Sequence, residues 1–129
     1  MATEIKEGLY YSDEHEWVRV DGEKAYIGIT DFAQHQLGDI VFVELPDLDS
    51  EFEAGESIGV IESVKAVSDM HTPVSGMVIA VNEGLEDAPE SLNSDPYGEH
   101  IAVIKMSNNA ELEKLMNSKE YADFCEKEE

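Results

Sequence analysis

The chain has 129 residues, a length that suits one domain with a single buried core and is too short for two. Thirty Asp and Glu residues against eight Lys and Arg give it a formal net charge of −22. So acidic a surface repels phosphate groups, which argues against nucleic acid or an anionic membrane as partner and favours basic surfaces of other proteins.

The sequence contains few signals of cellular targeting or of redox chemistry. Cys125 is the only cysteine, so no intrachain disulfide is possible, which fits a reducing compartment. The N-terminus lacks the apolar stretch of a signal peptide, and no segment approaches the roughly 18 apolar residues of a membrane span. We therefore expect a cytoplasmic protein, bacterial or archaeal, that acts as a monomer.

The first regular elements are predicted to be two paired strands. Residues 16–20 and 24–29 are rich in β-forming side chains and flank Asp21-Gly22, a strong hairpin signal. Trp17 lies in the first of these strands. Its large apolar ring predicts a core position.

A short helix is predicted next, over residues 31–37. Thr30 is a suitable N-cap, and Gly38 is a suitable residue to end the helix. We expect Gln34 and His35 to lie on its solvent-exposed side.

Strands are predicted over residues 40–45 and 57–63, with a loop over 47–55 between them. Gly59, inside the second strand, indicates a close backbone approach or a bend. This strand leads directly to Lys65, which would lie at the tip before the chain returns.

After the tip, residues 66–70 return as a strand, and 73–76 (Pro-Val-Ser-Gly) predict a second tight, hairpin-like turn before a strand over 77–81. Two such units within so short a stretch favour a mainly β fold, a small antiparallel sandwich or barrel.

The last part mixes short helices with one strand. Asp87 is a candidate cap for a helical turn through Leu92, and residues 101–106 predict the final strand. Apolar residues spaced three and four apart then predict C-terminal helices over about 109–126, with Ser118 as a cap. The β core spans about 10–106 of a single domain, 1–129.

Lys65 is unusual in its surroundings, because no other Lys or Arg lies between Lys24 and Lys105, a stretch that holds sixteen Asp and Glu. One interpretation is that Lys65 is an ordinary surface lysine. A Schiff-base lysine would normally be buried. An exposed amine at a tip instead suits modification by another enzyme, as the base of a mobile arm.

A self-contained enzyme is poorly supported. The sequence has no Gly-rich phosphate loop, nucleophile elbow or Cys-x-x-Cys motif. Its four histidines lack the spacing of metal ligands, so no metal site is predicted; they are at positions 15, 35, 71 and 100.

The stretch 62–69, Glu-Ser-Val-Lys-Ala-Val-Ser-Asp, resembles the lipoyl-attachment motif of the glycine cleavage system H-protein family. The resemblance extends over nearly the whole chain. Further matching segments, in order, are 15–20, 28–31, 37–46, 54–56, 73–76, 81–82 and 93–98.

The resemblance implies a flattened antiparallel sandwich or hybrid barrel of the lipoyl/biotinyl-domain type. It also implies lipoate, amide-linked to Lys65 as N6-lipoyllysine. Residues that would present the attachment loop are Glu62, Ser63, Val64, Ala66 and Asp69. For Ser63 and Asp69 an equally good reading is that they only satisfy turn backbone groups.

The function implied is that of a shuttle and not of a catalyst. The arm would carry the aminomethyl group from glycine decarboxylase (P-protein) to aminomethyltransferase (T-protein), and dihydrolipoamide dehydrogenase (L-protein) would reoxidise it. A lipoate ligase or a lipoyl/octanoyl transferase would attach the cofactor.

Alternatives to this function are a lipoate relay for another pathway and a non-lipoylated binding protein of the same fold. A biotin carrier fits less well, since Lys65 lies between Val64 and Ala66 where biotinylated lysines typically lie between methionines. The run His100-Ile-Ala102 departs from the family pattern by lacking a tryptophan, which predicts altered packing beside the last strand.

Overall fold

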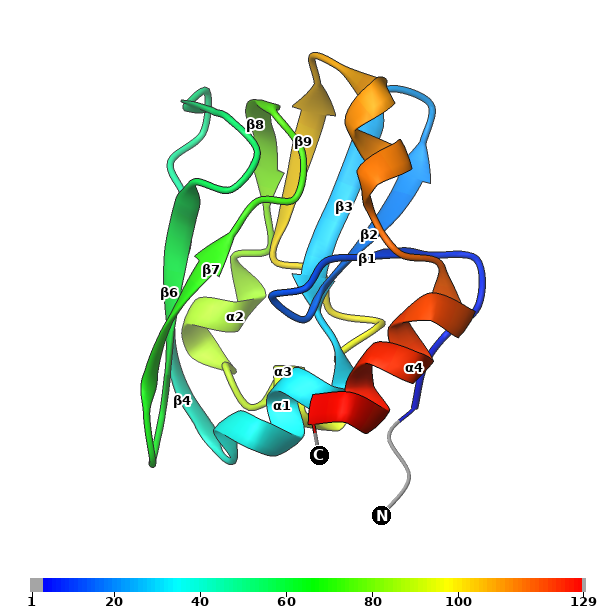
Figure 1. Ribbon diagram of the computed structural model, residues 1–129. Coiled ribbons are helices and arrows are strands. Elements are labelled where there is room, and N and C mark those ends of the chain that lie inside the picture. Colours follow the sequence, from blue (N-terminus) through cyan, green and yellow to red (C-terminus); the bar gives the residue numbers. More distant parts are fainter. Residues whose placement is uncertain (1–3, 129) are drawn as a thin grey trace.

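The structure, a computed structural model, describes residues 4–128 and contains two antiparallel sheets accompanied by short helices (Figure 1). The larger sheet contains, in spatial order, β1 (Tyr10–Tyr11), β2 (Glu16–Asp21), β3 (Lys24–Ile29), β9 (Ala102–Met106), β8 (Gly76–Val81) and β5 (Glu51–Phe52). The smaller sheet contains β4 (Ile40–Glu44), β6 (Ser57–Ser63) and β7 (Val67–His71). This confirms the predicted mainly β, antiparallel fold.

Within residues 4–128, five helical segments accompany the sheets: α1 (Asp31–Leu37), α2 (Gly84–Asp87), α3 (Ser91–Ser94), the 3₁₀ helix η1 (Asn109–Lys114) and α4 (Ser118–Glu128). The helix predicted over 31–37 and the C-terminal helices are confirmed. No helix among residues 4–128 is long and apolar enough to cross a membrane.

The first hairpin forms as predicted, but its turn is one residue later. Asp21 pairs with Lys24, so the turn residues are Gly22 and Glu23, where Asp21-Gly22 was expected. Gly22 has φ of 64°, a left-handed conformation that glycine adopts without a steric penalty. The two-residue turn thus starts at the glycine.

Side chains from the inner faces of both sheets form the main core, and an aromatic cluster forms a second one. Trp17 lies in the aromatic cluster with only 1% of its surface exposed, as predicted. Its indole N–H donates to the carbonyl oxygen of Pro96 at 3.0 Å, which satisfies the one polar atom of the ring.

Helix α1 begins as predicted, because the Thr30 hydroxyl oxygen accepts the N–H of Ala33 at 3.2 Å. His35 is exposed as expected, but the prediction for Gln34 was wrong, since it is buried. The Gln34 amide donates to Asp31 at 2.8 Å and accepts from Asn93 at 3.0 Å. Packing of α1 against α3 therefore covers a polar side chain that finds its partners there.

The segment 73–76 is not a second hairpin turn, which corrects the prediction. Strand β8, which follows it, pairs with β9 and β5 of the larger sheet and not with β7. The segment instead carries the chain from the smaller sheet to the larger one. The predicted loop 47–55 likewise contains the short strand β5.

Two predicted helix caps are also displaced. Asp87 is the last residue of α2, whereas Leu92 belongs to the separate helix α3. At the start of α4, Asn117 is the cap in place of Ser118, since its side-chain oxygen accepts the Glu120 N–H at 2.8 Å. The Glu120 carboxylate accepts the Asn117 N–H at 3.0 Å, which completes a reciprocal capping box.

Candidate functional site

Lys65 lies at the tip of the hairpin between β6 and β7, which projects at the lower left of Figure 1. The last cross-strand pair is Glu62 with Val67, and the Ser63 N–H donates to the carbonyl oxygen of Ala66 at 2.8 Å. Val64, Lys65 and Ala66 are all exposed. The predicted position of Lys65, an exposed amine between two strands, is confirmed.

The tip is held by hydrogen bonds within the turn and to a neighbouring loop. The Ser63 hydroxyl oxygen accepts the backbone N–H groups of Lys65 at 3.2 Å and of Ala66 at 3.0 Å. The Val64 N–H donates to the carbonyl oxygen of Asp39 at 3.0 Å. The base of the lysine is thereby fixed, while its side chain remains open to solvent.

Gly38 explains why the lysine side chain can lie along this loop. A Cβ atom at Gly38 would lie only 3.3 Å from Lys65 Cε, and Gly38 has φ of 77°. Both observations favour glycine at the end of α1.

Replacement of Ser63 with alanine is expected to loosen the tip without unfolding the domain. The lost hydroxyl contacts should lower the free energy of unfolding by about 1 kcal/mol. Backbone amide exchange at Lys65 and Ala66 should become faster, as measured by hydrogen exchange and NMR. Ser57→Ala is the matched control, because that hydroxyl only donates to Gly59 O at 3.3 Å; equal exchange in both variants would contradict the role of Ser63.

The other predicted presentation residues lie in two places. Ser63, Val64 and Ala66 form the turn itself, which brings them next to Lys65. Glu62 lies between Phe42 and Val67 in a cross-strand row, whereas Asp69 is farther along β7, opposite Val60.

A cavity of about 530 Å³ lies beside the tip, along β7. Residues from Ala66 to Met70 form one wall, and apolar side chains of α1 and β6 contribute to the lining. Five of the lining residues carry carboxyl groups: Asp13, Glu14, Glu16, Asp69 and Glu128. The cavity therefore combines an apolar floor with strong negative charge.

The carboxyl group of Glu16 is the buried member of this set, with 3% of the residue exposed. Burial is the main reason that its pKa is raised to about 8, while hydrogen bonds from the His71 backbone and Ser12 act in the opposite direction. Sequence reasoning missed this group. Strand alternation did not mark it, because Glu16, Trp17 and Val18 are all buried in β2.

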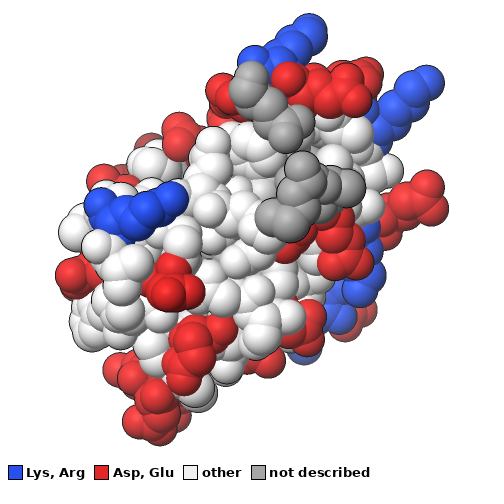
Figure 2. Space-filling view, turned by 90° about the horizontal axis from the view of Figure 1, so that it is seen from below, with Lys and Arg blue, Asp and Glu red and all other residues white. Residues whose placement is uncertain are grey.

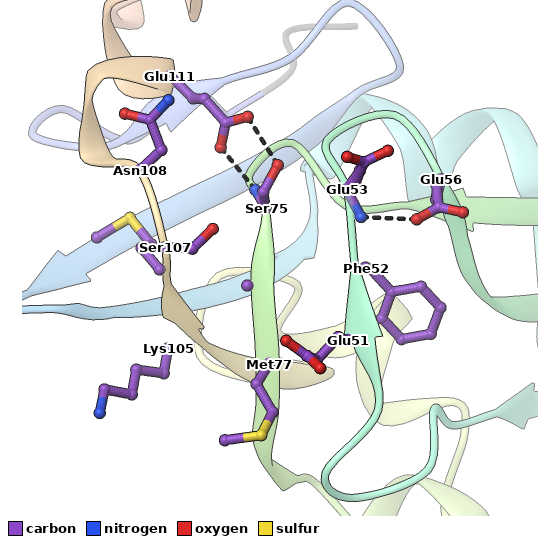
Figure 3. Close-up of a pocket in the computed structure, with 12 residues that line it drawn as sticks. Glu51, Phe52, Glu53, Glu56, Ser75, Met77, Lys105, Ser107, Asn108 and Glu111 are labelled. Carbon is purple, nitrogen blue, oxygen red and sulfur yellow. Dashed lines mark hydrogen bonds between the residues drawn. The ribbon is translucent and has the colours of Figure 1, made fainter.

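A cavity of about 610 Å³ lies at the other end of β6, among β5, β8 and the start of η1 (Figure 3). One carboxylate there, that of Glu111, accepts hydrogen bonds from the backbone N–H and the hydroxyl of Ser75, both at 2.7 Å. None of the predicted site residues lines this cavity. Among residues 4–128, no group of three His, Cys, Asp or Glu side chains could hold a metal ion.

The run 100–102, where the sequence departs from the family pattern, lies away from Lys65. The His100 ring meets the Tyr26 ring edge-on, with ring centres 5.2 Å apart. Arg19 lies over the same ring at 4.2 Å. The imidazole therefore packs against Tyr26 of β3, whose ring also contacts Arg19 of β2.

Comparisons with known proteins agree on one family. The family model described as "Glycine cleavage H-protein" matches residues 9–128. A "Glycine cleavage system H protein" of Syntrophomonas wolfei is 55% identical over 125 residues, covering 97% of this chain and 96% of the relative. One of Alkaliphilus oremlandii is 59% identical over 121 residues, covering 94% and 95%.

A solved structure is also similar to this chain. The crystal structure of a glycine cleavage system H protein from Mycobacterium marinum superposes with a TM-score of 0.85 at 35% identity, covering 92% of this chain and 97% of that one.

Two small antiparallel sheets that present one lysine at a hairpin tip define the class of carrier proteins, which hold a group for other enzymes. The chain belongs to the glycine cleavage H-protein family. As a member of that family it is a lipoyl carrier protein of the glycine cleavage system and not itself a catalyst.

Proposed function

We propose that Lys65 carries lipoate as N6-lipoyllysine and that the arm shuttles the aminomethyl group from P-protein to T-protein, with reoxidation by L-protein. The observation that supports this proposal is that Lys65 is exposed on a hairpin tip whose backbone is fixed by hydrogen bonds. A lipoate ligase or a lipoyl/octanoyl transferase must reach the amine from outside, and exposure permits this. We also propose that the protein works as a monomer in the bacterial cytoplasm, since its relatives are bacterial and a net charge of −22 opposes self-association.

The residues around Lys65 fit such an arm. The tip holds the backbone of Lys65 in place, so motion is confined to the side chain and what is attached to it. When bound, the lipoyl group supplies sulfur atoms that take up the aminomethyl group of glycine and are reoxidised afterwards. The tether keeps this cargo at high effective concentration near each active site.

The acidic cavity beside the tip suits the charge of the cargo. An aminomethyl group is an amine and is cationic near neutral pH. The cavity offers apolar surface from Leu37 and Ile61 together with the buried carboxyl group of Glu16. We propose that the loaded arm rests there between encounters, protected from bulk water.

The outer face of the smaller sheet supports docking of partner enzymes. Phe42, Glu62 and Val67 form one cross-strand row beside the tip, and Glu44, Val60 and Asp69 form the next. Phe42 is 48% exposed and Val67 is 70% exposed, so apolar groups alternate with carboxylates on an open surface.

Charge favours basic partners for this end of the molecule. Figure 2, which views the molecule from below, the side toward which the tip points, shows more Asp and Glu than Lys and Arg around a largely uncharged middle. Amide formation at Lys65 would remove one of the eight Lys and Arg charges of the chain. A partner with Lys and Arg around an apolar contact is therefore the best fit.

The double variant Glu44→Gln with Glu62→Gln is expected to weaken encounters with the partner enzymes. We expect kcat/KM for the carrier to fall roughly threefold to tenfold at low salt, and by less at high salt, because screening shortens the range of the attraction. Glu51→Gln with Glu53→Gln removes the same charge at the other end of β6 and should have little effect. Equal losses in the two double variants would show that only net charge matters.

The proposed function is tested by intact mass after incubation with a lipoate ligase and lipoate. One lipoyl group should be added, and the product should support glycine decarboxylation and exchange with P-protein. No gain in mass would favour a non-lipoylated binding protein. A fully lipoylated chain that stays inert with P-protein would favour a lipoate relay.

A further inference from the structure

Hydrogen bonds around Glu16 have the pattern of an ionised carboxylate. Its Oε1 accepts the Ser12 hydroxyl at 2.9 Å, and its Oε2 accepts the His71 backbone N–H at 2.8 Å. The Ser12 oxygen itself accepts the N–H groups of Glu14 at 3.3 Å and Glu16 at 3.1 Å, so its one hydrogen is available for Glu16. Both carboxylate oxygens therefore act as acceptors.

Burial works against that ionised form. It raises the pKa of Glu16 to about 8, and the nearby carboxylates of Glu14 and Asp13 add to the shift. A carboxylate removed from water needs a compensating positive charge. The ionised form that the hydrogen bonds favour would be stabilised by a nearby base that holds the proton of Glu16.

The imidazole of His71 is placed to be that base. Its Nδ1 lies 3.8 Å from Oε2 of Glu16 and 3.8 Å from Oε2 of Glu14. Among side chains within residues 4–128, this Nδ1 is the only buried nitrogen or oxygen without a hydrogen-bond partner. An imidazole nitrogen left unpaired beside a buried carboxyl group calls for an explanation.

Other charged groups around the pair do not supply the missing cation. Glu16 lines both the cavity beside the tip and another, smaller cavity of about 280 Å³ that also borders His71. Among the described residues, no Lys or Arg lines either one. The remaining titratable groups of the two linings are Asp13, Glu14 and His15 before β2, Asp69 of β7 and Glu128 of α4. Burial lowers the pKa of His15, which disfavours its cationic form; its Nδ1 is hydrogen-bonded to the Tyr121 hydroxyl at 2.8 Å and its Nε2 faces Glu128 at 3.7 Å.

We propose that His71 takes the proton of Glu16 on Nδ1 and so keeps a carboxylate in the wall of the cavity beside Lys65. One proton moves from Glu16 Oε2 to His71 Nδ1, and the summed charge of the two groups is unchanged. A small rotation of the partly exposed imidazole shortens the 3.8 Å separation to a hydrogen bond. The purpose of the carboxylate, to meet a cationic cargo, rests on the proposed function.

The test follows the Glu16 side-chain carboxyl carbon by NMR between about pH 5 and 9. Unmodified full-length protein is compared with His71→Asn, which retains the backbone N–H donor to Glu16. Loss of the imidazole should move the Glu16 midpoint upward by about one pH unit. His35→Asn is the matched control, since His35 lies on α1 next to Asp31 at 3.4 Å and lines neither cavity; it should leave the midpoint unchanged.

A second measurement guards against a local folding defect in His71→Asn. The ring nitrogen shifts of His71 should respond to Glu16→Gln in a chain whose imidazole is intact. A response to Glu14→Gln alone, or the same Glu16 midpoint with and without the imidazole, would overturn the proton-sharing pair. Because no lipoate is present, these results do not depend on whether Lys65 can be lipoylated, and the mass measurement does not depend on them.

Discussion

Replacement of Lys65 with arginine is expected to abolish lipoylation completely. The guanidinium group retains the positive charge and similar reach, but it stays protonated and offers no free amine for an amide bond. Intact mass after treatment with lipoate ligase and lipoate should show no gain. Glycine decarboxylation and exchange with P-protein should fall to the level of a mixture without the carrier.

Lys105→Arg is the matched control for that loss. Lys105 is exposed, but it lies in β9 of the larger sheet and outside the β6–β7 hairpin. This variant should gain one lipoyl group and support the reaction as the unaltered chain does. A lipoyl gain on the Lys65→Arg chain would place the modification at another lysine and contradict the role of the hairpin tip.

Replacement of Trp17 with alanine is expected to have the largest effect on stability. The ring is almost fully buried, contacts Tyr97 with ring centres 6.4 Å apart, and donates its N–H to Pro96. It also fills the space over Gly28, where a Cβ atom would come within 2.6 Å of the indole. Removing it leaves a large cavity and an unpaired carbonyl group.

We expect the free energy of unfolding to fall by about 3–5 kcal/mol, measured by urea denaturation. The melting temperature should fall by roughly 10–20 °C. Val20→Ala, in the same strand but 37% exposed, should change stability by no more than about 0.5 kcal/mol. A loss for Trp17→Ala as small as that of the control would show that the aromatic cluster is not a major source of stability.

Local patterns were sufficient for much of this fold. The β6 strand was predicted with the bounds that the structure has, and Thr30 and Gly38 marked the ends of α1 correctly. The close approach predicted for Gly59 is present, since a Cβ atom there would lie 2.3 Å from the carbonyl oxygen of Glu44. The strand and helix bounds depend on interactions within the strand and the caps, whereas the glycine marks its close contact with another strand only by lacking a side chain.

The errors at Gln34 and at residues 73–76 arose where distant segments meet, whereas the shifted hairpin turn and the shifted cap of α4 are local errors of one residue. The buried position of Gln34 depends on Asn93, 59 residues away, and the pairing of β8 depends on β9 and β5. A turn-forming sequence such as 73–76 indicates that the chain changes direction. It does not indicate which strand the following segment pairs with, because the choice of partner strand depends on long-range packing.

The sequence by itself determined that Lys65 is isolated, exposed and set in a family-specific motif, because charge spacing and turn chemistry are local properties. Only the tertiary structure decided what surrounds the lysine. Glu16 and His71 are 55 residues apart, and their contact exists because the start of β2 lies against the end of β7. The acidic cavity and its buried carboxyl group therefore follow from how the two sheets pack and not from any one stretch of the chain.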